Sequence, residues 1–237
     1  MYLQEIEVEV GRGKLEDWLV NSRVYLGALA RQPGGVWFRI LRSLDDGNRF
    51  ISLRGWVDKE ASERAWRSPE LAWASAQAKA LDFYGRNPVA RREHEVLDFT
   101  WGPRGPGVFP GEGRVVHHVT GGVGTGKYGA WRPYSRLLFA VMTRQPGVAS
   151  FEIMRPAAEP EGFFVLRSFM SAGDERGAPG GGNTPAEVKY ALDPVEKYGL
   201  YEGARPAVSR RFAVHDMVWG AAGAGAVQSF MESLKPV

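Results

Sequence analysis

Cysteine is absent from the 237 residues of this chain. Disulfide bonds, thiolate metal sites and a cysteine nucleophile are therefore excluded. No apolar run approaches the roughly 18 residues that a membrane-spanning helix needs. The acidic, alternating start at residues 1–7 does not have the pattern of a secretory signal either. We therefore expect a cytoplasmic protein with no membrane partner.

Lysine is also scarce, since only 7 of the 30 basic residues are Lys. The basic residues are spread along the chain among 27 acidic ones, and the densest groups are pairs such as Arg91-Arg92 and Arg210-Arg211. A nucleic-acid-binding surface requires clustered basic residues, so we expect no nucleic-acid partner. The composition, 44% hydrophobic and 24% charged, is that of one large globular domain or two smaller ones.

A glycine-rich stretch from Gly121 to Lys127 fits the G-x-x-x-x-G-K pattern of a phosphate-binding loop. Such a loop needs Ser or Thr after the Lys to hold Mg²⁺, and this chain has Tyr128 there. A related turn at Gly11 to Lys14 lacks the pattern but follows the first expected strand in the same way. We interpret both stretches as strand-to-helix turns, where glycine supplies the backbone freedom.

The sequence contains an internal repeat. Ala30 to Gly34 (ARQPG) corresponds to Thr143 to Gly147 (TRQPG), and the register then continues without a gap through the next expected strands. Near the end of each copy, Asp98 to Gly102 corresponds to Asp216 to Gly220. The register changes once, in the Gly- and Pro-rich insert around residues 177–183. Two copies of one structural unit are therefore expected.

Each repeat predicts the order β-α-β-β-α-β, which is the ferredoxin-like sandwich with both helices on one face of an antiparallel sheet. In the first repeat, Ser68-Pro69-Glu70 restarts the second helical region, because proline suits a first helical turn. Such a sheet leaves its other face uncovered. We therefore predict an α+β fold in which tandem ferredoxin-like repeats form an intramolecular α+β barrel of the dimeric type. The expected domains are repeat 1 at 1–102, a linker at 103–113, repeat 2 at 114–220 and a C-terminal tail at 221–237.

Alternation along the strands predicts which side chains enter the core. Phe38 and Ile40 in the first repeat, like Phe151 and Ile153 in the second, are assigned to the helix-covered face.

The residues that follow this order resemble the antibiotic biosynthesis monooxygenase family of dimeric α+β barrels. The resemblance rests on Gln32-Pro33-Gly34, on a hairpin that ends in Leu53-Arg54-Gly55-Trp56, and on Ala65 to Glu70 (AWRSPE) in the next helical region. It implies a small-molecule pocket, expected in the first repeat because the insert replaces the Trp-bearing turn in the second. It also implies a monomer with an internal pseudo-dimer, or a homodimer.

The resemblance implies a cofactor-independent monooxygenase that acts on a small aromatic substrate such as a quinol or anthrone. The expected catalytic residues are Trp66, Tyr84 and Arg54, and the expected substrate-binding residues are Trp37, Trp56 and Trp73. An aromatic side chain at any one of these positions is also typical of core packing, and Arg54 is also expected to pair with a carboxylate such as Asp98.

Two alternatives remain open. The first is a non-catalytic module of the same fold that binds a small molecule or serves a structural role. The second is haem binding through one of four histidines, His94, His117, His118 and His215. The haem-degrading relatives use a Trp in the second helix, which Trp66 matches, and a later His, where this chain has Ala76. No cofactor and no metal site are expected.

Overall fold

The computed structural model describes residues 1–105, 114–177 and 185–234. The chain divides into two compact units, which we call the first unit (1–95 with 212–237) and the second unit (96–211). Of the expected linker at 103–113, residues 106–113 lie outside the described residues, as do residues 178–184 of the glycine-rich insert.

The first unit has the predicted element order, with its second helical region in two pieces. Its elements are β1 (Tyr2–Glu9), α1 (Leu15–Ala30), β2 (Gly35–Ser43), β3 (Arg49–Trp56), α2 (Lys59–Trp66), α3 (Pro69–Ala80) and the first part of β4 (Ala90–Trp101). The Ser68 hydroxyl accepts a hydrogen bond from the backbone N–H of Leu71 at 3.3 Å, and Pro69 is the first residue of α3. This cap and proline end one helix and begin the next, as predicted.

The second unit repeats this order. Its elements are β5 (Val115–Gly122), α4 (Tyr128–Thr143), β6 (Val148–Pro156), β7 (Gly162–Phe169), α5 (Ala172–Gly177), α6 (Ala186–Lys197) and the first part of β8 (Val208–Trp219). The predicted α+β fold with two βαββαβ repeats is therefore confirmed.

The last strand of each repeat runs from one unit into the other. Residues 90–95 of β4 pair with β1 in the first unit, whereas residues 212–219 of β8 pair with β2 there. The sheet of the first unit accordingly has the order β4-β1-β3-β2-β8, with antiparallel neighbours throughout. The described strands are hydrogen-bonded in the order β1-β3-β2-β8-β5-β7-β6-β4, which closes on itself as the predicted barrel requires.

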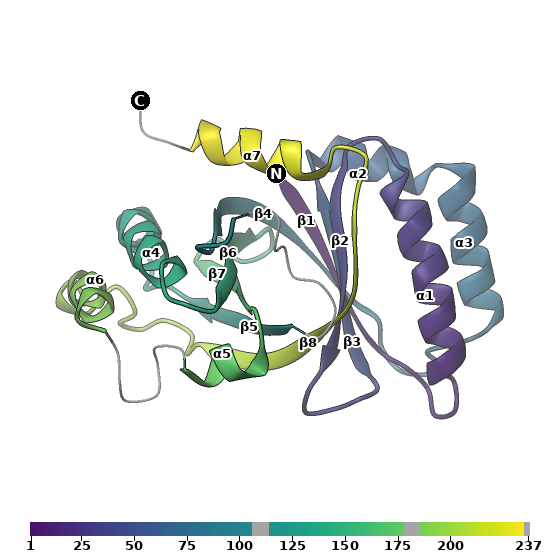
Figure 1. The fold of residues 1–237 in the computed structure, drawn as a ribbon, viewed down its shortest axis with the longest axis horizontal. Helices are drawn as coiled ribbons and strands as arrows, with labels where there is room; N and C mark the ends of the chain where they lie inside the picture. The colour runs from purple at the N-terminus through teal and green to yellow at the C-terminus, as the bar shows by residue number, and fades with distance from the viewer. Residues whose placement is uncertain (106–113, 178–184, 235–237) are drawn as a thin grey trace. The chain divides into compact units, whose positions relative to one another are not determined.

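In the first unit, α1 and α3 lie side by side on one face of β1, β2 and β3 (Figure 1). Phe38 and Ile40 of β2 belong to the core under these helices, together with Phe50 and Trp56 of β3. Phe151 and Ile153 occupy the corresponding core of the second unit. The predicted alternation is thus confirmed in both repeats. The intervening residues Trp37 and Arg39 are also fully buried, so neither face of β2 is exposed to solvent.

The glycine-rich stretch at 121–127 ends in a strand-to-helix turn. Lys127 Nζ donates a hydrogen bond to the carbonyl of Gly199 at 2.8 Å, and Lys14 Nζ donates to the carbonyl of Leu81 at 3.1 Å in the first unit. Gly13 and Gly126 both have positive φ. In each unit, the lysine of the turn is therefore hydrogen-bonded to the loop after the second helical region, as expected of a structural turn.

The segment at 221–237, expected to be a tail, contains a helix, α7 (Gly223–Ser233), that belongs to the first unit. The backbone N–H of Ala222 donates to the carbonyl of Gly35 at 2.8 Å, which anchors the entry to α7 at the start of β2. Gly220 is needed here because a Cβ at this residue would lie 2.3 Å from the backbone of Gly35.

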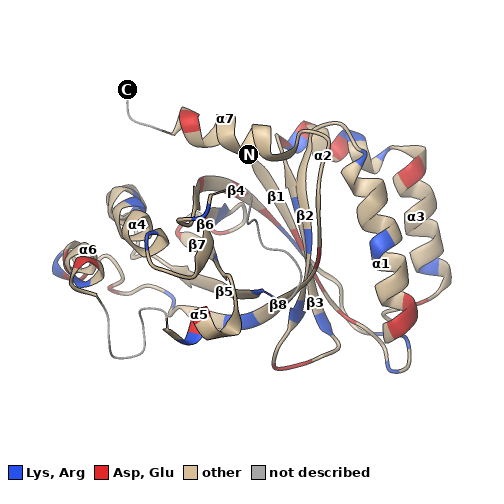
Figure 2. Ribbon diagram, in the orientation of Figure 1, with Lys and Arg blue, Asp and Glu red and all other residues tan. Residues whose placement is uncertain are grey.

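Most helices of the two units have both basic and acidic residues, whereas α4 has only basic ones and α7 only an acidic one (Figure 2). Among the described helices, none is long and apolar enough to cross a membrane.

Candidate functional site

A cavity of about 480 Å³ lies between the helices and the sheet of the first unit. Helix α1, strands β1–β3, helices α2 and α3, and the loop that leads to β4 all contribute to its wall. The lining residues used below are Trp18, Tyr25, Ser52, Arg54, Trp66, Asp82, Tyr84 and Asn87. Three of them, Arg54, Trp66 and Tyr84, are the residues that the sequence nominated for catalysis, so the fold brings them to one cavity.

Arg54 supplies a buried cation to this cavity. Its residue is 7% exposed, and its guanidinium lies 5.0 Å from the ring centroids of both Tyr25 and Trp66. Its Nε donates to the Ser52 hydroxyl at 3.2 Å, while its Nη1 has no hydrogen-bond partner among the described residues. Burial lowers the pKa of Arg54, but a guanidinium stays charged at neutral pH.

Asp98, the carboxylate expected as an alternative partner of Arg54, is paired with another arginine. The Asp98 carboxylate accepts a hydrogen bond from Arg136 Nε at 2.8 Å in the second unit. Among the ion pairs of the described residues, none includes Arg54. The buried charge of Arg54 therefore meets aromatic faces and the space of the cavity.

Trp66 lines the cavity, and its N–H is hydrogen-bonded to a residue outside the cavity lining. Its Nε1 donates to Gln4 Oε1 at 3.2 Å, which fixes the indole at the end of α2. Tyr25 of α1 lies beside it, with ring centroids 6.4 Å apart. Arg54, Tyr25 and Trp66 together form a wall suited to a flat, electron-rich ligand.

Tyr84 is held by Trp18 of α1. The Trp18 Nε1 donates to the Tyr84 hydroxyl at 3.3 Å. Because a phenol oxygen can accept and donate at once, the Tyr84 hydroxyl proton is left for an acceptor on another side. Tyr84 and Trp18 both line the cavity, so a bound ligand is one such acceptor.

Asp82 is a site residue that the sequence interpretation missed. It is the sole carboxylate among the described residues that line this cavity. Its φ is +44°, a left-handed conformation rare for a residue other than glycine. The loop of the second unit has Gly199 at the matching point, with φ +54°. An Asp in a position that suits glycine is a signal of function only once the backbone is known.

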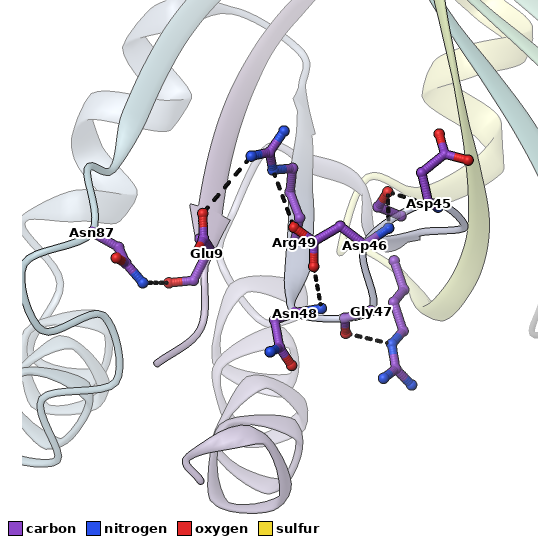
Figure 3. A network of polar contacts seen from close by, with 9 residues as sticks. Glu9, Asp45, Asp46, Gly47, Asn48, Arg49 and Asn87 are labelled. Carbon is purple, nitrogen blue, oxygen red and sulfur yellow. Dashed lines mark hydrogen bonds and ion pairs between the residues drawn. The ribbon is translucent and has the colours of Figure 1, made fainter. Parts of the chain in front are cut away.

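Asn87 links the cavity wall to the β2–β3 hairpin (Figure 3). Its Nδ2 donates to the carbonyl of Glu9 at 3.1 Å, and the Glu9 carboxylate lies 3.8 Å from Arg49 Nη2. Arg49 in turn approaches Asp46 of the hairpin turn at 4.0 Å. This network fixes the loop that contains Asp82 and Tyr84 to the end of the sheet.

The three predicted substrate-binding tryptophans lie elsewhere. Trp37 and Trp56 are fully buried, Trp56 against Phe38 with ring centroids 5.1 Å apart, and Trp73 is 57% exposed on α3. None of them is among the described residues that line the cavity. Trp66 ends α2 and Trp73 lies on α3, so the break before Pro69 separates the two rings that a continuous helix would have aligned.

The histidines have partners away from this cavity. His94 is buried against Glu5, with Nε2 and Oε2 3.0 Å apart, and His117 lies 2.7 Å from Glu175 in the second unit. No histidine is among the described residues that line the first unit's cavity, and no group of three or more potential metal ligands occurs in the described part of the chain. A haem with a histidine ligand does not fit this cavity.

The second unit also contains a cavity, of about 530 Å³. A pocket was expected in the first repeat, and the first unit has one. The second unit has a pocket as well. Its lining includes Arg167, the counterpart of Arg54.

Fold and site together define a tandem α+β protein with a small-molecule cavity in each unit. The profile of the antibiotic biosynthesis monooxygenase family matches residues 1–78, within the first repeat, in agreement with the predicted resemblance. Among curated proteins, none matches the chain.

Solved structures extend the likeness in fold to the whole chain. A candidate monooxygenase from Fusobacterium nucleatum aligns with a TM-score of 0.72 and 8% identity, over 92% of this chain and 94% of that one. A candidate monooxygenase from Lactobacillus acidophilus gives a TM-score of 0.69 and 7% identity, over 92% and 96% of the two chains. An anthrone oxidase-like protein gives 0.61 and 12% identity, over 93% of each chain. At these identities the likeness concerns the fold alone.

Proposed function

We propose that the protein is a cofactor-independent monooxygenase that oxidises a small aromatic substrate, a quinol or an anthrone, in the cavity of the first unit. The observation that carries this proposal is the buried guanidinium of Arg54, which has no carboxylate partner among the described residues and faces a cavity lined by aromatic rings. The family whose profile matches within the first repeat and the names of the proteins with a similar fold support it.

The cavity suits the size and character of such a substrate. Its volume of about 480 Å³ lies within the range of small-molecule sites, roughly 300 to 1,000 Å³. The rings of Tyr25 and Trp66 offer flat faces, and Arg54 lies within cation–π distance of both. A phenolate or enolate oxygen placed at Arg54 gains a charge-assisted hydrogen bond in a largely buried setting.

The chemistry begins with loss of a proton from the substrate. Arg54 stabilises the resulting oxyanion, in the way that a positioned donor stabilises developing charge. Asp82, the sole carboxylate among the described lining residues, accepts the proton. The electron-rich carbon of the anion then reacts with O₂ to give a peroxide, which the Tyr84 hydroxyl protonates.

The reaction balances without a further reductant. For an anthrone, the CH₂ group and O₂ give a ketone and water. One oxygen atom forms the C=O bond, and the other leaves as water with the two hydrogen atoms of the CH₂ group. Both electron pairs needed to reduce O₂ come from the two C–H bonds that break, so the substrate itself is the reductant.

Oxygen uptake with anthrones and hydroquinones tests this proposal. We expect the wild-type protein to consume O₂ in proportion to the substrate oxidised. An Arg54→Met variant should lose about 100-fold or more in kcat/KM, the scale expected for a transition-state donor. The matched control is Arg167→Met, which alters the equivalent arginine in the second unit and should keep wild-type turnover. Tight binding of the substrate with no oxygen uptake would instead identify a non-catalytic binding module.

A further inference from the structure

The cavity of the first unit has two further basic residues in its wall. Lys79 of α3 and Arg91 of β4 both line it, and both residues are exposed to solvent, whereas Arg54 is buried. We call the part of the wall formed by Lys79 and Arg91 the mouth of the cavity. The proposed oxidation uses neither of these two side chains.

The pairing of β1 with its two neighbours places Arg91 on the same face of the sheet as Arg54. Ile6 of β1 lies opposite Ser52 of β3 on one side and opposite Arg91 of β4 on the other. Directly opposed residues of antiparallel strands project to one face, and Arg54 follows Ser52 by two residues, so it projects to that face too. Ile6 belongs to the core under the helices. Arg54 and Arg91 therefore both point to the helix-covered side of the sheet.

Lys79 reaches the mouth from the helical layer. Ser75 and Lys79 are four residues apart on α3, so they share one side of the helix. Both of them line the cavity. A lysine lays its hydrocarbon stem along an apolar wall and keeps its ammonium group in water. The ammonium group of the exposed Lys79 therefore lies at the solvent end of the wall.

The two cations of the mouth are not neutralised by carboxylates of the described residues. Among the ion pairs found in the described part of the chain, none includes Lys79 or Arg91. By contrast, the adjacent Arg92 lies 2.8 Å from the Glu5 carboxylate. The charged residues among the described lining are three cations and one carboxylate, Arg54, Lys79, Arg91 and Asp82. The wall therefore has an excess of positive charge.

The spacing of the cations suits an elongated aromatic ligand with two negative groups. Arg54 is assigned to the oxyanion that forms in the reaction, so the mouth is left for a second acidic group. One strand separates β3 from β4, which puts their backbones about 10 Å apart. A fused system of two or three aromatic rings has a similar length. A ligand with a phenolic oxygen at Arg54 therefore extends as far as the mouth.

Arg54 and Arg91 also influence each other electrostatically. Burial lowers the pKa of Arg54, and the positive charge of Arg91 lowers it further. An anionic group bound near both guanidinium groups offsets their mutual repulsion.

We propose that the substrate of the first unit is an aromatic carboxylate, whose carboxylate binds to Lys79 and Arg91 at the mouth while its rings lie against Tyr25 and Trp66. This inference rests on the proposed function and names the class of its substrate. Arginine offers two parallel N–H donors to a carboxylate, and lysine adds a compact charge. The mouth therefore selects, among quinols and anthrones, those that carry a carboxylate.

A matched pair of anthraquinones tests the proposal without turnover. Rhein is a hydroxylated anthraquinone with one carboxylate, and aloe-emodin has a hydroxymethyl group in place of that carboxylate. Isothermal titration calorimetry measures the Kd of each. We expect wild type to bind rhein roughly tenfold more tightly than aloe-emodin, the scale of a hydrogen bond to a charged group. Changing Lys79→Gln and Arg91→Gln together should remove this preference and leave the Kd of aloe-emodin within about twofold of the wild-type value.

Arg86→Gln is the matched control variant. Arg86 is exposed in the loop before β4 and is not among the described residues that line the cavity. Its substitution removes the same charge without altering the mouth, so rhein affinity should stay within about twofold of the wild-type value. Arg54→Met should weaken both quinones, as expected if both bind in this cavity. All the substitutions at the mouth and in the control are at exposed residues, so each variant should fold, and circular dichroism and Tm check this.

Three results would overturn the proposal. The first is equal affinity of the wild type for the two quinones. The second is a preference for rhein that persists in the folded double variant. The third is an equal loss of rhein affinity in Arg86→Gln and Arg91→Gln, which would assign the preference to overall charge.

Oxygen uptake keeps this proposal distinct from the proposed function. If rhein binds as expected and no anthrone or hydroquinone, with or without a carboxylate, is oxidised, the oxygenase function fails and the preference of the cavity for an aromatic carboxylate stands. If anthrones are oxidised and rhein has no advantage over aloe-emodin, only the proposed substrate class fails.

Discussion

The Trp18 indole donates a hydrogen bond to the Tyr84 hydroxyl at 3.3 Å, and Trp131 donates to Tyr201 at 3.0 Å in the second unit. Each pair ties the first helix of a repeat to the loop before its last strand. The bond is therefore part of the architecture of both repeats. Only Tyr84 shares its cavity with a carboxylate among the described lining residues, so the proposed chemistry assigns a further role to one of two equivalent tyrosines.

Replacing each tyrosine with Phe separates these roles. Tyr84→Phe and Tyr201→Phe each leave an indole N–H without its acceptor, which should cost about 1 kcal/mol of unfolding free energy in both cases. Turnover should fall in Tyr84→Phe alone. Urea denaturation and oxygen uptake measure the two effects. An equal loss of turnover in both variants would assign the tyrosines a structural role only.

Arg54 is expected to contribute to substrate binding without stabilising the folded protein. A buried cation without a carboxylate partner carries a desolvation cost, and methionine fills a similar volume without that cost. The unfolding free energy of Arg54→Met should therefore equal that of the wild type or exceed it by about 1 kcal/mol. Affinity for a phenolate substrate should fall at the same time. A destabilisation of several kcal/mol would show that Arg54 holds the fold together.

Asp82 offers a test in which backbone and carboxylate effects have opposite signs. Glycine at φ +44° relieves the left-handed strain, so Asp82→Gly should be neutral or stabilising by up to about 1 kcal/mol. Removing a general base should nevertheless lower kcat by about 100-fold or more. Asp82→Asn, which keeps the shape, should lose turnover to the same extent. Full activity in Asp82→Asn would exclude the carboxylate as the base.

Trp56 and Trp73 should differ sharply in their effect on stability. Trp56 is fully buried in the first unit's core, so Trp56→Ala should cost about 3–5 kcal/mol. Trp73 is 57% exposed, so Trp73→Ala should change the unfolding free energy by about 0.5 kcal/mol or less and leave kcat/KM unchanged. A large loss of kcat/KM in Trp73→Ala would restore Trp73 as a substrate-binding residue.

Glu175 gives the second unit a pH-dependent contribution to stability. Hydrogen bonding from Arg211, and further from His117, lowers the pKa of Glu175 to about 2. Because the folded pKa lies below the unfolded value of about 4.3, the contribution is present above pH 4.3 and is lost as pH falls toward 2. The unfolding free energy of the wild type minus that of Glu175→Gln should decrease over this range, by about 1–2 kcal/mol. A difference in unfolding free energy that does not change with pH would contradict the lowered pKa of Glu175.

Much of the fold could be predicted from the sequence because the patterns that indicate strands and helices occur twice, once in each repeat. Alternation placed Phe38 and Ile40 in the core, and their counterparts Phe151 and Ile153 behave alike. Ser68 and Pro69 located the break between two helices. The sequence did not predict that the last strand of each repeat belongs partly to each unit. A 12-residue strand such as β4 has no local sequence feature that marks where it leaves one unit and enters the other.

The candidate site was only partly predictable for a related reason. Arg54, Trp66 and Tyr84 were nominated from the resemblance and from their expected places on the hairpin and the second helical region, and the structure brings them to one cavity. The same criteria nominated Trp37, Trp56 and Trp73, but none of these three tryptophans lines the cavity. Their burial and the direction of their helix or strand depend on tertiary packing, which the sequence does not show. Asp82 was missed because the only sign of its role is a backbone angle, which a sequence does not show.

The most direct test of the central claim is oxidation of an anthrone under isotopically labelled dioxygen, with oxygen uptake and product mass measured together. The proposed oxygenase activity predicts one O₂ consumed per product molecule and one labelled oxygen atom in the ketone. It also predicts loss of both signals in Arg54→Met and their retention in Arg167→Met. Binding of the anthrone without oxygen uptake, or a ketone that carries oxygen from water, would contradict it.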